Sequence, residues 1–145
     1  MTAHSSSLTR WIFRHAVVVW LGIALNLGFA LPLLFDPAWL LDLFGVPGAA
    51  TVWPRFAGLL LIILSVFYVP ATLDIDRYRI FAWLHVLPSR TFGAVFFSLA
   101  VLVYGQPYGL LVAVLIDGGI AALSLVCLIR LSETEARLAA RGAGP

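Results

Sequence analysis

One carboxylate stands deep inside an otherwise uncharged stretch of the C-terminal half. Asp117 lies about nine residues into the apolar run 109–129, which is about 13 Å along a helix at 1.5 Å per residue. A carboxyl group at that depth in a membrane costs free energy, so it should face other protein groups rather than lipid, and it marks a candidate site. The chemistry open to it is the binding of a proton, a quinone-like headgroup or a small polar substrate.

Polar side chains at a matching depth are expected in the other apolar runs, and they are Asn26, Ser65 and Ser98. Gly118 and Gly119 follow Asp117 directly and would let a neighbouring helix, lipid or cofactor approach closely. Two interpretations stay open. The layer is either a buried ligand site, or a hydrogen-bonded layer that holds the helices in register, with a neutral Asp117 donating to Asn26 or to a backbone carbonyl.

Arginines supply every cation of the chain and suggest two further sites. Arg55 is expected to pair with Asp36 and Asp42, either as an ion pair that clamps a short helix or as an anion or lipid-headgroup site. The other candidates are expected to bind lipid headgroups at the opposite surface, and Arg90 to reach that surface by extending its long side chain. These headgroup ligands are Arg77, Arg79 and Arg90.

Several kinds of chemistry find no support in the residues. His4, His15 and His85 are dispersed, which gives no metal-ligand spacing, and Cys127 has no second cysteine for a redox pair. Nucleophile elbows, phosphate-binding loops and basic-aromatic surfaces for nucleic acid are also missing from the sequence. We therefore expect no metal, no intrinsic cofactor and no nucleic-acid partner, and a non-enzymatic function is favoured.

The elements that must position these residues are four apolar runs. Hydrophobic residues make up 62% of the chain and charged residues 11%, far from the roughly 25% charged of soluble domains. A helix needs about 20 apolar residues to cross a bilayer. The sequence predicts an all-α chain, a single transmembrane four-helix bundle with spans at about 16–35, 55–73, 89–105 and 108–130. Residues 131–145 would form a cytoplasmic tail, with a capping box at 132–135 starting a short surface helix.

The third crossing has two possible starts, because an apolar stretch at 80–87 ends at Pro88. The favoured interpretation is an interfacial stretch followed by a crossing that begins near Pro88. The alternative is one longer helix that the proline distorts.

The arginines also predict how the chain is oriented. Cationic residues concentrate on the cytoplasmic side of membrane proteins, which indicates a bacterial inner-membrane protein with both termini in the cytoplasm. Asp36, Pro37 and Gly45 are typical of the start and end of a short helix, which would lie in the periplasmic interface. Arginines on the cytoplasmic side are Arg10, Arg14, Arg77, Arg79, Arg90, Arg130, Arg137 and Arg141, against Arg55 alone on the other.

The whole pattern resembles the DoxX-like group of small four-helix bacterial membrane proteins, over about residues 15–130. The residues that carry the resemblance are Pro37, Leu40, Leu41, Leu43, Phe44, Gly45 and Pro47, then Arg55-x-x-Gly58, and Asp117. It implies a four-helix fold and an association with membrane redox complexes such as quinol oxidases.

The expected function is a non-catalytic accessory subunit of a respiratory or photosynthetic membrane complex, where any quinone, lipid or pigment contacted would belong to the partner. The alternatives are a homo-oligomeric, proton-coupled transporter or a quinone- or lipid-binding protein, both centred on Asp117.

Overall fold

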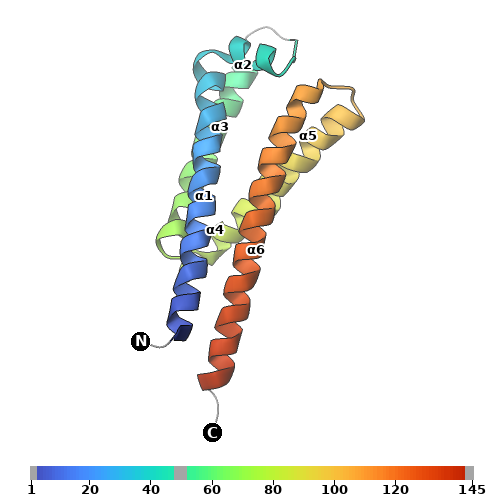
Figure 1. Ribbon diagram of the computed structural model, residues 1–145. Coiled ribbons are helices and arrows are strands. Elements are labelled where there is room, and N and C mark those ends of the chain that lie inside the picture. Colours follow the sequence, from blue (N-terminus) through green and yellow to red (C-terminus); the bar gives the residue numbers. More distant parts are fainter. Residues whose placement is uncertain (1–2, 48–51, 143–145) are drawn as a thin grey trace.

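The computed structural model describes residues 3–47 and 52–142, and every regular element in those ranges is a helix (Figure 1). Four segments are long and apolar enough to cross a membrane: Ser7–Phe35, Val52–Leu73, Arg79–Leu102 and Tyr108–Arg141. The prediction of an all-α chain with four helices able to span a membrane is therefore confirmed. The elements in order are α1 (Ala3–Phe35), α2 (Pro37–Leu43), α3 (Val52–Leu73), α4 (Arg79–Leu84), the π-helix η1 (His85–Thr91), α5 (Phe92–Leu102), the 3₁₀ turn η2 (Tyr108–Leu110) and α6 (Leu111–Gly142).

The short helix α2 forms where the sequence predicts it. The Asp36 side chain accepts a hydrogen bond from the Trp39 backbone N–H at 3.3 Å, and Pro37 occupies the first turn. Gly45 follows with φ +67°, a left-handed conformation that glycine adopts without steric cost. Gly105, with φ +64°, plays the same role in the turn between α5 and η2.

The third crossing differs from the favoured interpretation. No break occurs at Pro88: α4, η1 and α5 continue one another from Arg79 to Leu102, as the alternative of one longer, proline-distorted helix requires. Proline lacks an N–H and clashes with the preceding turn, and the wider π-helical turn absorbs this without ending the helix.

The fourth helix also runs further than predicted. The expected separate surface helix after Arg130 is wrong, because α6 continues through the predicted capping box to Gly142. Thr134 Oγ1 donates to the Arg130 carbonyl at 2.7 Å, and Arg130 pairs with Glu133 at 3.2 Å, both along the helix. Residues 131–141 contain neither proline nor glycine, so nothing interrupts the helical hydrogen bonding.

The larger cluster of buried apolar side chains lies at the end of the bundle that carries the termini. There, α1 packs against a cluster of buried side chains that we call the terminal apolar cluster: Ala71, Ile75, Ala82, Val86, Leu128 and Leu131. Leu8, Trp11 and Ile12 of α1 lie against it. Toward α2, α1 and α6 diverge in the view of Figure 1. The bundle is thus closed by apolar side chains at the terminal end and wider at the α2 end.

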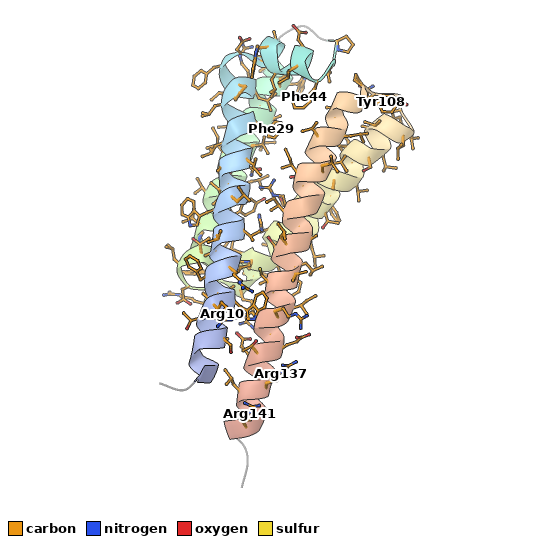
Figure 2. The ribbon with its side chains drawn as sticks, viewed as in Figure 1. Arg10, Phe29, Phe44, Tyr108, Arg137 and Arg141 are labelled. Atoms are coloured by element: carbon orange, nitrogen blue, oxygen red, sulfur yellow. The ribbon has the colours of Figure 1, made fainter. Side chains whose placement is uncertain are left out.

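The two ends of the bundle also differ in the side chains that they carry. Arg10, Arg137 and Arg141 lie at the end that carries the termini, whereas Phe29, Phe44 and Tyr108 lie toward the α2 end (Figure 2). Phe29 and Phe44 stack with ring centroids 5.8 Å apart, which ties α1 to the turn after α2.

Candidate functional site

The centre of the bundle holds a buried ion pair between Arg90 and Asp117. Arg90 Nη1 donates to Asp117 Oδ1 at 2.6 Å, and Arg90 Nη2 donates to the Gly22 carbonyl at 2.7 Å. The Arg90 side chain is 4% exposed and the Asp117 side chain 20%. The expectation that Arg90 reaches the surface is therefore wrong, and Asp117 accepts from Arg90 where a donation to Asn26 or to a backbone carbonyl was expected. A buried guanidinium and carboxylate neutralise each other, which is why both lie away from the surface.

The π-helix η1 positions Arg90 for this pair. Thr91 Oγ1 donates to the carbonyl of Val86 at 2.8 Å, five residues earlier, and thereby supports the wide turn. The extended third helix places Arg90 about 11 residues from the start at Arg79, or about 16 Å along the axis, rather than at the helix entry. π-Helical turns occur often at functional sites because they turn side chains away from the regular helical face.

Two glycines let the charged side chains into the bundle. A Cβ at Gly93 would lie 2.6 Å from Asp117 Oδ2, and a Cβ at Gly22 would lie 3.0 Å from Arg90 Nη2. By contrast, a Cβ at Gly118 would meet its nearest neighbour at 4.0 Å, and one at Gly119 would meet nothing within 4 Å. Close approach at this site therefore depends on Gly22 and Gly93, not on the predicted Gly118 and Gly119.

The central cavity opens beside the ion pair. Asn26, Arg90 and Asp117 supply its polar groups in a volume of about 320 Å³. Asn26 Nδ2 donates to Ser65 Oγ at 3.2 Å, and Ser65 Oγ donates to the Leu61 carbonyl at 2.8 Å. The remaining lining is apolar: Phe29, Leu33, Ala57, Leu60, Leu61, Phe97, Ala113 and Ile116.

A second cavity, of about 330 Å³, adjoins the first on the side of α2. We call it the α2-side cavity. The two share five wall residues: Phe29, Leu33, Ala57, Phe97 and Ala113. Beyond these the lining comes from α2, its following turn, the start of α3 and η2: Leu40, Leu41, Phe44, Val46, Trp53, Pro54 and Leu110. An almost purely apolar space thus extends from the polar groups at the bundle centre to α2.

Other buried polar groups lie between the ion pair and the terminal end of the bundle. The His85 ring packs edge-on against Tyr68 with centroids 4.4 Å apart, and the Tyr68 hydroxyl is hydrogen-bonded to Ser89 Oγ. His15, His85 and Ser124 are at most 1% exposed, and their side-chain polar atoms have no hydrogen-bond partner within the protein. Arg90 Nε is buried and unpartnered as well.

Of the predicted central layer, Asn26, Ser65 and Asp117 are brought together, whereas Ser98 is not. Ser98 Oγ donates to the Ala94 carbonyl of its own helix at 2.7 Å and does not line the central cavity. A polar side chain at a matching depth joins the site only if its helix face also matches, and depth alone carries no information about the face.

The predicted outer site does not assemble in the structure. Arg55, Asp36 and Asp42 are all exposed, and within the described residues none of the three makes an ion pair. Asp36 instead caps α2. Arg79 is partly buried and pairs with Glu135 of α6 and, at 3.4 Å, with Asp76, so it ties the helices together instead of facing outward alone. Arg77 is exposed, stacks on Tyr78 at 5.4 Å and stays available to headgroups.

Sequence reasoning missed the partner of Asp117, the two contact glycines and the buried histidines. The signal for Arg90 was present, since the stretch 80–104 carries no other charge and reads as one long apolar helix once Pro88 is allowed inside it. His15, Gly22 and Asn26 recur at intervals of seven and four residues, which places them on one face of α1.

Comparison with known proteins found no matching family model, no similar curated protein and no similar solved structure. The resemblance to DoxX-like proteins therefore stays a prediction.

Proposed function

We propose that this chain is a membrane protein that binds an amphipathic molecule, such as a quinone or a lipid, in the central cavity. The polar head would lie at Arg90, Asp117 and Asn26, and the apolar tail would extend into the α2-side cavity. The observation that carries the proposal is the buried Arg90–Asp117 pair at one end of an otherwise apolar space.

The chemistry of the site fits a head that accepts hydrogen bonds. Ligand pockets combine predominantly apolar walls with a few convergent polar groups that fix orientation. Arg90 is 4% exposed and still has a free donor at Nε, and Asp117 is the more exposed partner at 20%. A carbonyl or carboxylate oxygen would accept from the guanidinium, and a hydroxyl would donate to Asp117.

The size of the two cavities favours one extended chain over a bulky ligand. Each has a volume of about 320–330 Å³, near the lower limit of typical ligand pockets. Their shared wall runs along α1, α3, α5 and α6, so an occupant would lie along the bundle axis.

The proposed setting is a bacterial inner membrane, with α2 in the periplasmic interface and both termini in the cytoplasm. The apolar outer faces of the four long helices favour a lipid environment. An accessory role in a larger membrane complex is compatible with ligand binding, because such a subunit would hold a quinone or lipid that its partner uses.

Binding can be measured by a change in tryptophan fluorescence, which is quenching for a quinone and a shift of the emission wavelength for an acyl chain, because Trp53 lines the α2-side cavity. The purified protein in mild detergent would be titrated with a benzoquinone that carries a decyl tail and, separately, with oleate. We expect saturable binding of one of these probes, lost in Arg90→Gln and weakened in Asp117→Asn. The matched control is Ser98→Ala, which removes a hydroxyl at similar depth that does not line the central cavity.

The two probes separate the ligand sources, since the quinone presents carbonyls and oleate a carboxylate. Binding of neither probe, together with absence of any lipid or quinone in the intact protein by native mass spectrometry, would contradict the proposed function.

A further inference from the structure

Three buried polar side chains lie outside both cavities, and the proposed ligand binding does not explain why they are buried there. His15, His85 and Ser124 are at most 1% exposed, yet both nitrogens of each imidazole and the serine hydroxyl lack hydrogen-bond partners in the protein. Native proteins leave few buried polar atoms unsatisfied, since each costs about 1–3 kcal/mol. The hydrogen-bonding capacity of five such atoms in one region is not met in this conformation, which indicates that they have a function besides packing.

The three groups follow one another along the contact between α1 and α6. At Gly22 the helices meet: a Cβ there would lie 3.2 Å from Ile120 Cγ2 and 3.3 Å from His85 Nε2. From that level toward the terminal end, Ser124 is one turn beyond Ile120 on α6, and His15 is two turns before Gly22 on α1. They therefore lie in the order His85, Ser124, His15.

This row begins at the proposed ligand site and ends at the terminal apolar cluster. His85 and Arg90 both lie against Gly22, and Arg90 binds Asp117 beside the central cavity. At the far end, Leu128 and Leu131 of α6 pack with Trp11 and Ile12 of α1. The polar row is thus connected to the cavity and separated by apolar side chains from the surface at the terminal end.

We propose that His85, Ser124 and His15 form a gated proton route that links the Arg90–Asp117 site to the side of the membrane where the termini lie. In this structure the terminal apolar cluster closes the route. In a second conformation α1 and α6 separate at that cluster, water enters, and the imidazoles pass protons between Asp117 and the bulk phase. Histidines and intramembrane carboxylates are the usual members of such relays. The inference rests on the proposed ligand site and makes its occupancy proton-coupled.

The groups around the imidazoles come from several helices. His85 packs against Tyr68 of α3 and, together with Arg90 of its own helix, lies against Gly22 of α1, and His15 of α1 is near enough to act on it electrostatically. Asp117 of α6 reaches this group through Arg90. Within the described residues, no carboxylate pairs directly with either imidazole, so neither is held permanently charged by an anion.

Cys127 offers a test that needs no substitution. It is 6% exposed and lies on α6 one turn from Ser124, next to Leu128 of the cluster. The wild-type protein would be reconstituted in liposomes and treated with a charged, membrane-impermeant methanethiosulfonate reagent from either side. We expect modification of Cys127 from the side of the termini, with little from the other side. An unmodified Cys127 would overturn the route.

General loosening of the protein is excluded by a matched buried position. In a Cys127→Ala background, Ala100→Cys places a thiol at a buried site on α5, away from the route. We expect this thiol to stay unreacted. Equal modification at both positions would also count against the proposal.

Proton movement is measured with the purified protein in weakly buffered detergent that contains a pH-sensitive dye, while the decyl quinone probe is added. We expect proton uptake on probe binding by the wild type, lost in His85→Phe and in Ser124→Ala, and kept in Leu123→Ala, which changes a neighbouring exposed side chain. Uptake in His85→Phe equal to the wild type would contradict the route. If the probe binds while Cys127 stays unmodified, the binding site is retained and the route is rejected. If Cys127 is modified but no probe binds, only the binding site is rejected.

Discussion

At the scale of single residues, Arg90 and Asp117 depend on each other. Removing a charged group from water costs several kcal/mol, and a partner at 2.6 Å offsets most of that cost. Gly93 and Gly22 leave room for this arrangement, because a Cβ at Gly93 would overlap Asp117 Oδ2 and a Cβ at Gly22 would crowd Arg90 Nη2. Because the attraction mainly offsets the cost of burial, the pair adds little to the stability of the fold. It is better suited to a binding site, where a ligand can rearrange the two side chains.

Removing one partner should be far worse than removing both. We expect Arg90→Met to lower the free energy of unfolding by about 3–5 kcal/mol, because Asp117 is left buried without its cation. The double variant with Asp117→Leu should recover much of that loss. The measurement is equilibrium unfolding in mixed micelles at increasing denaturing detergent. Additive effects of the two substitutions would argue that the side chains act independently.

The contact glycines give a second prediction. Gly93→Ala should destabilise the protein by about 1–3 kcal/mol, the usual cost of overpacking, because the new Cβ would overlap Asp117 Oδ2 at 2.6 Å. Gly119→Ala is the control, since nothing lies within 4 Å of its Cβ position. It should be neutral, or up to about 1 kcal/mol more stable from helix propensity. Similar losses at both positions would contradict the assignment of close approach to Gly93.

At the scale of elements, the π-helix η1 decides which side chains reach the bundle centre. Ser89 turns toward Tyr68 and α3, while the adjacent Arg90 turns toward α1 and α6. Pro88 lies in this turn and cannot donate to a preceding carbonyl, which favours the wide geometry over a regular α-helical one.

Replacing Pro88 by a residue with a backbone N–H should therefore disturb the Arg90–Asp117 site more than the fold. We expect Pro88→Ala to draw η1 toward α-helical geometry and rotate Arg90 away from Asp117, so that binding of the decyl quinone or oleate probe weakens. Helicity by circular dichroism and thermal stability should change little. Pro70→Ala, near the end of α3, is the control because Pro70 lines neither cavity. Equal probe binding by wild type and Pro88→Ala would show that η1 does not position the site.

The sequence predicted the elements better than their contacts. Four helices follow from uncharged runs near the length of a bilayer crossing, and α2 follows from Asp36, Pro37 and Gly45, because those signals are local. The predicted start of the third helix near Pro88 was wrong, because a proline ends a helix or stays inside it depending on whether a π-turn forms around it. The Arg90–Asp117 pair, 27 positions apart in sequence, depends on how two helices rotate about their axes, which composition does not encode.

At the scale of the whole molecule, the two ends of the bundle differ in chemistry. Arg10, Arg137 and Arg141 lie at the end that carries the termini, whereas Phe29, Phe44 and Tyr108 lie toward the α2 end (Figure 2). The terminal apolar cluster closes the first end, while the cavities reach α2 at the other. A ligand would therefore enter from the α2 side or from lipid beside it.

The orientation of this asymmetry in the membrane is the final prediction. Cytoplasmic loops carry the excess of arginine in bacterial membrane proteins, so we expect both termini in the cytoplasm and α2 on the opposite side. A green fluorescent protein fused after residue 142 should fluoresce, and alkaline phosphatase fused there should be inactive. A phosphatase fusion after Val46, following α2, should be active. Replacing Arg10 and Arg14 by serine should reduce the bias without reversing it, because Arg77, Arg79, Arg130, Arg137 and Arg141 remain. An active phosphatase at the C-terminus would invert the molecule and place the mouth of the cavities in the cytoplasmic leaflet.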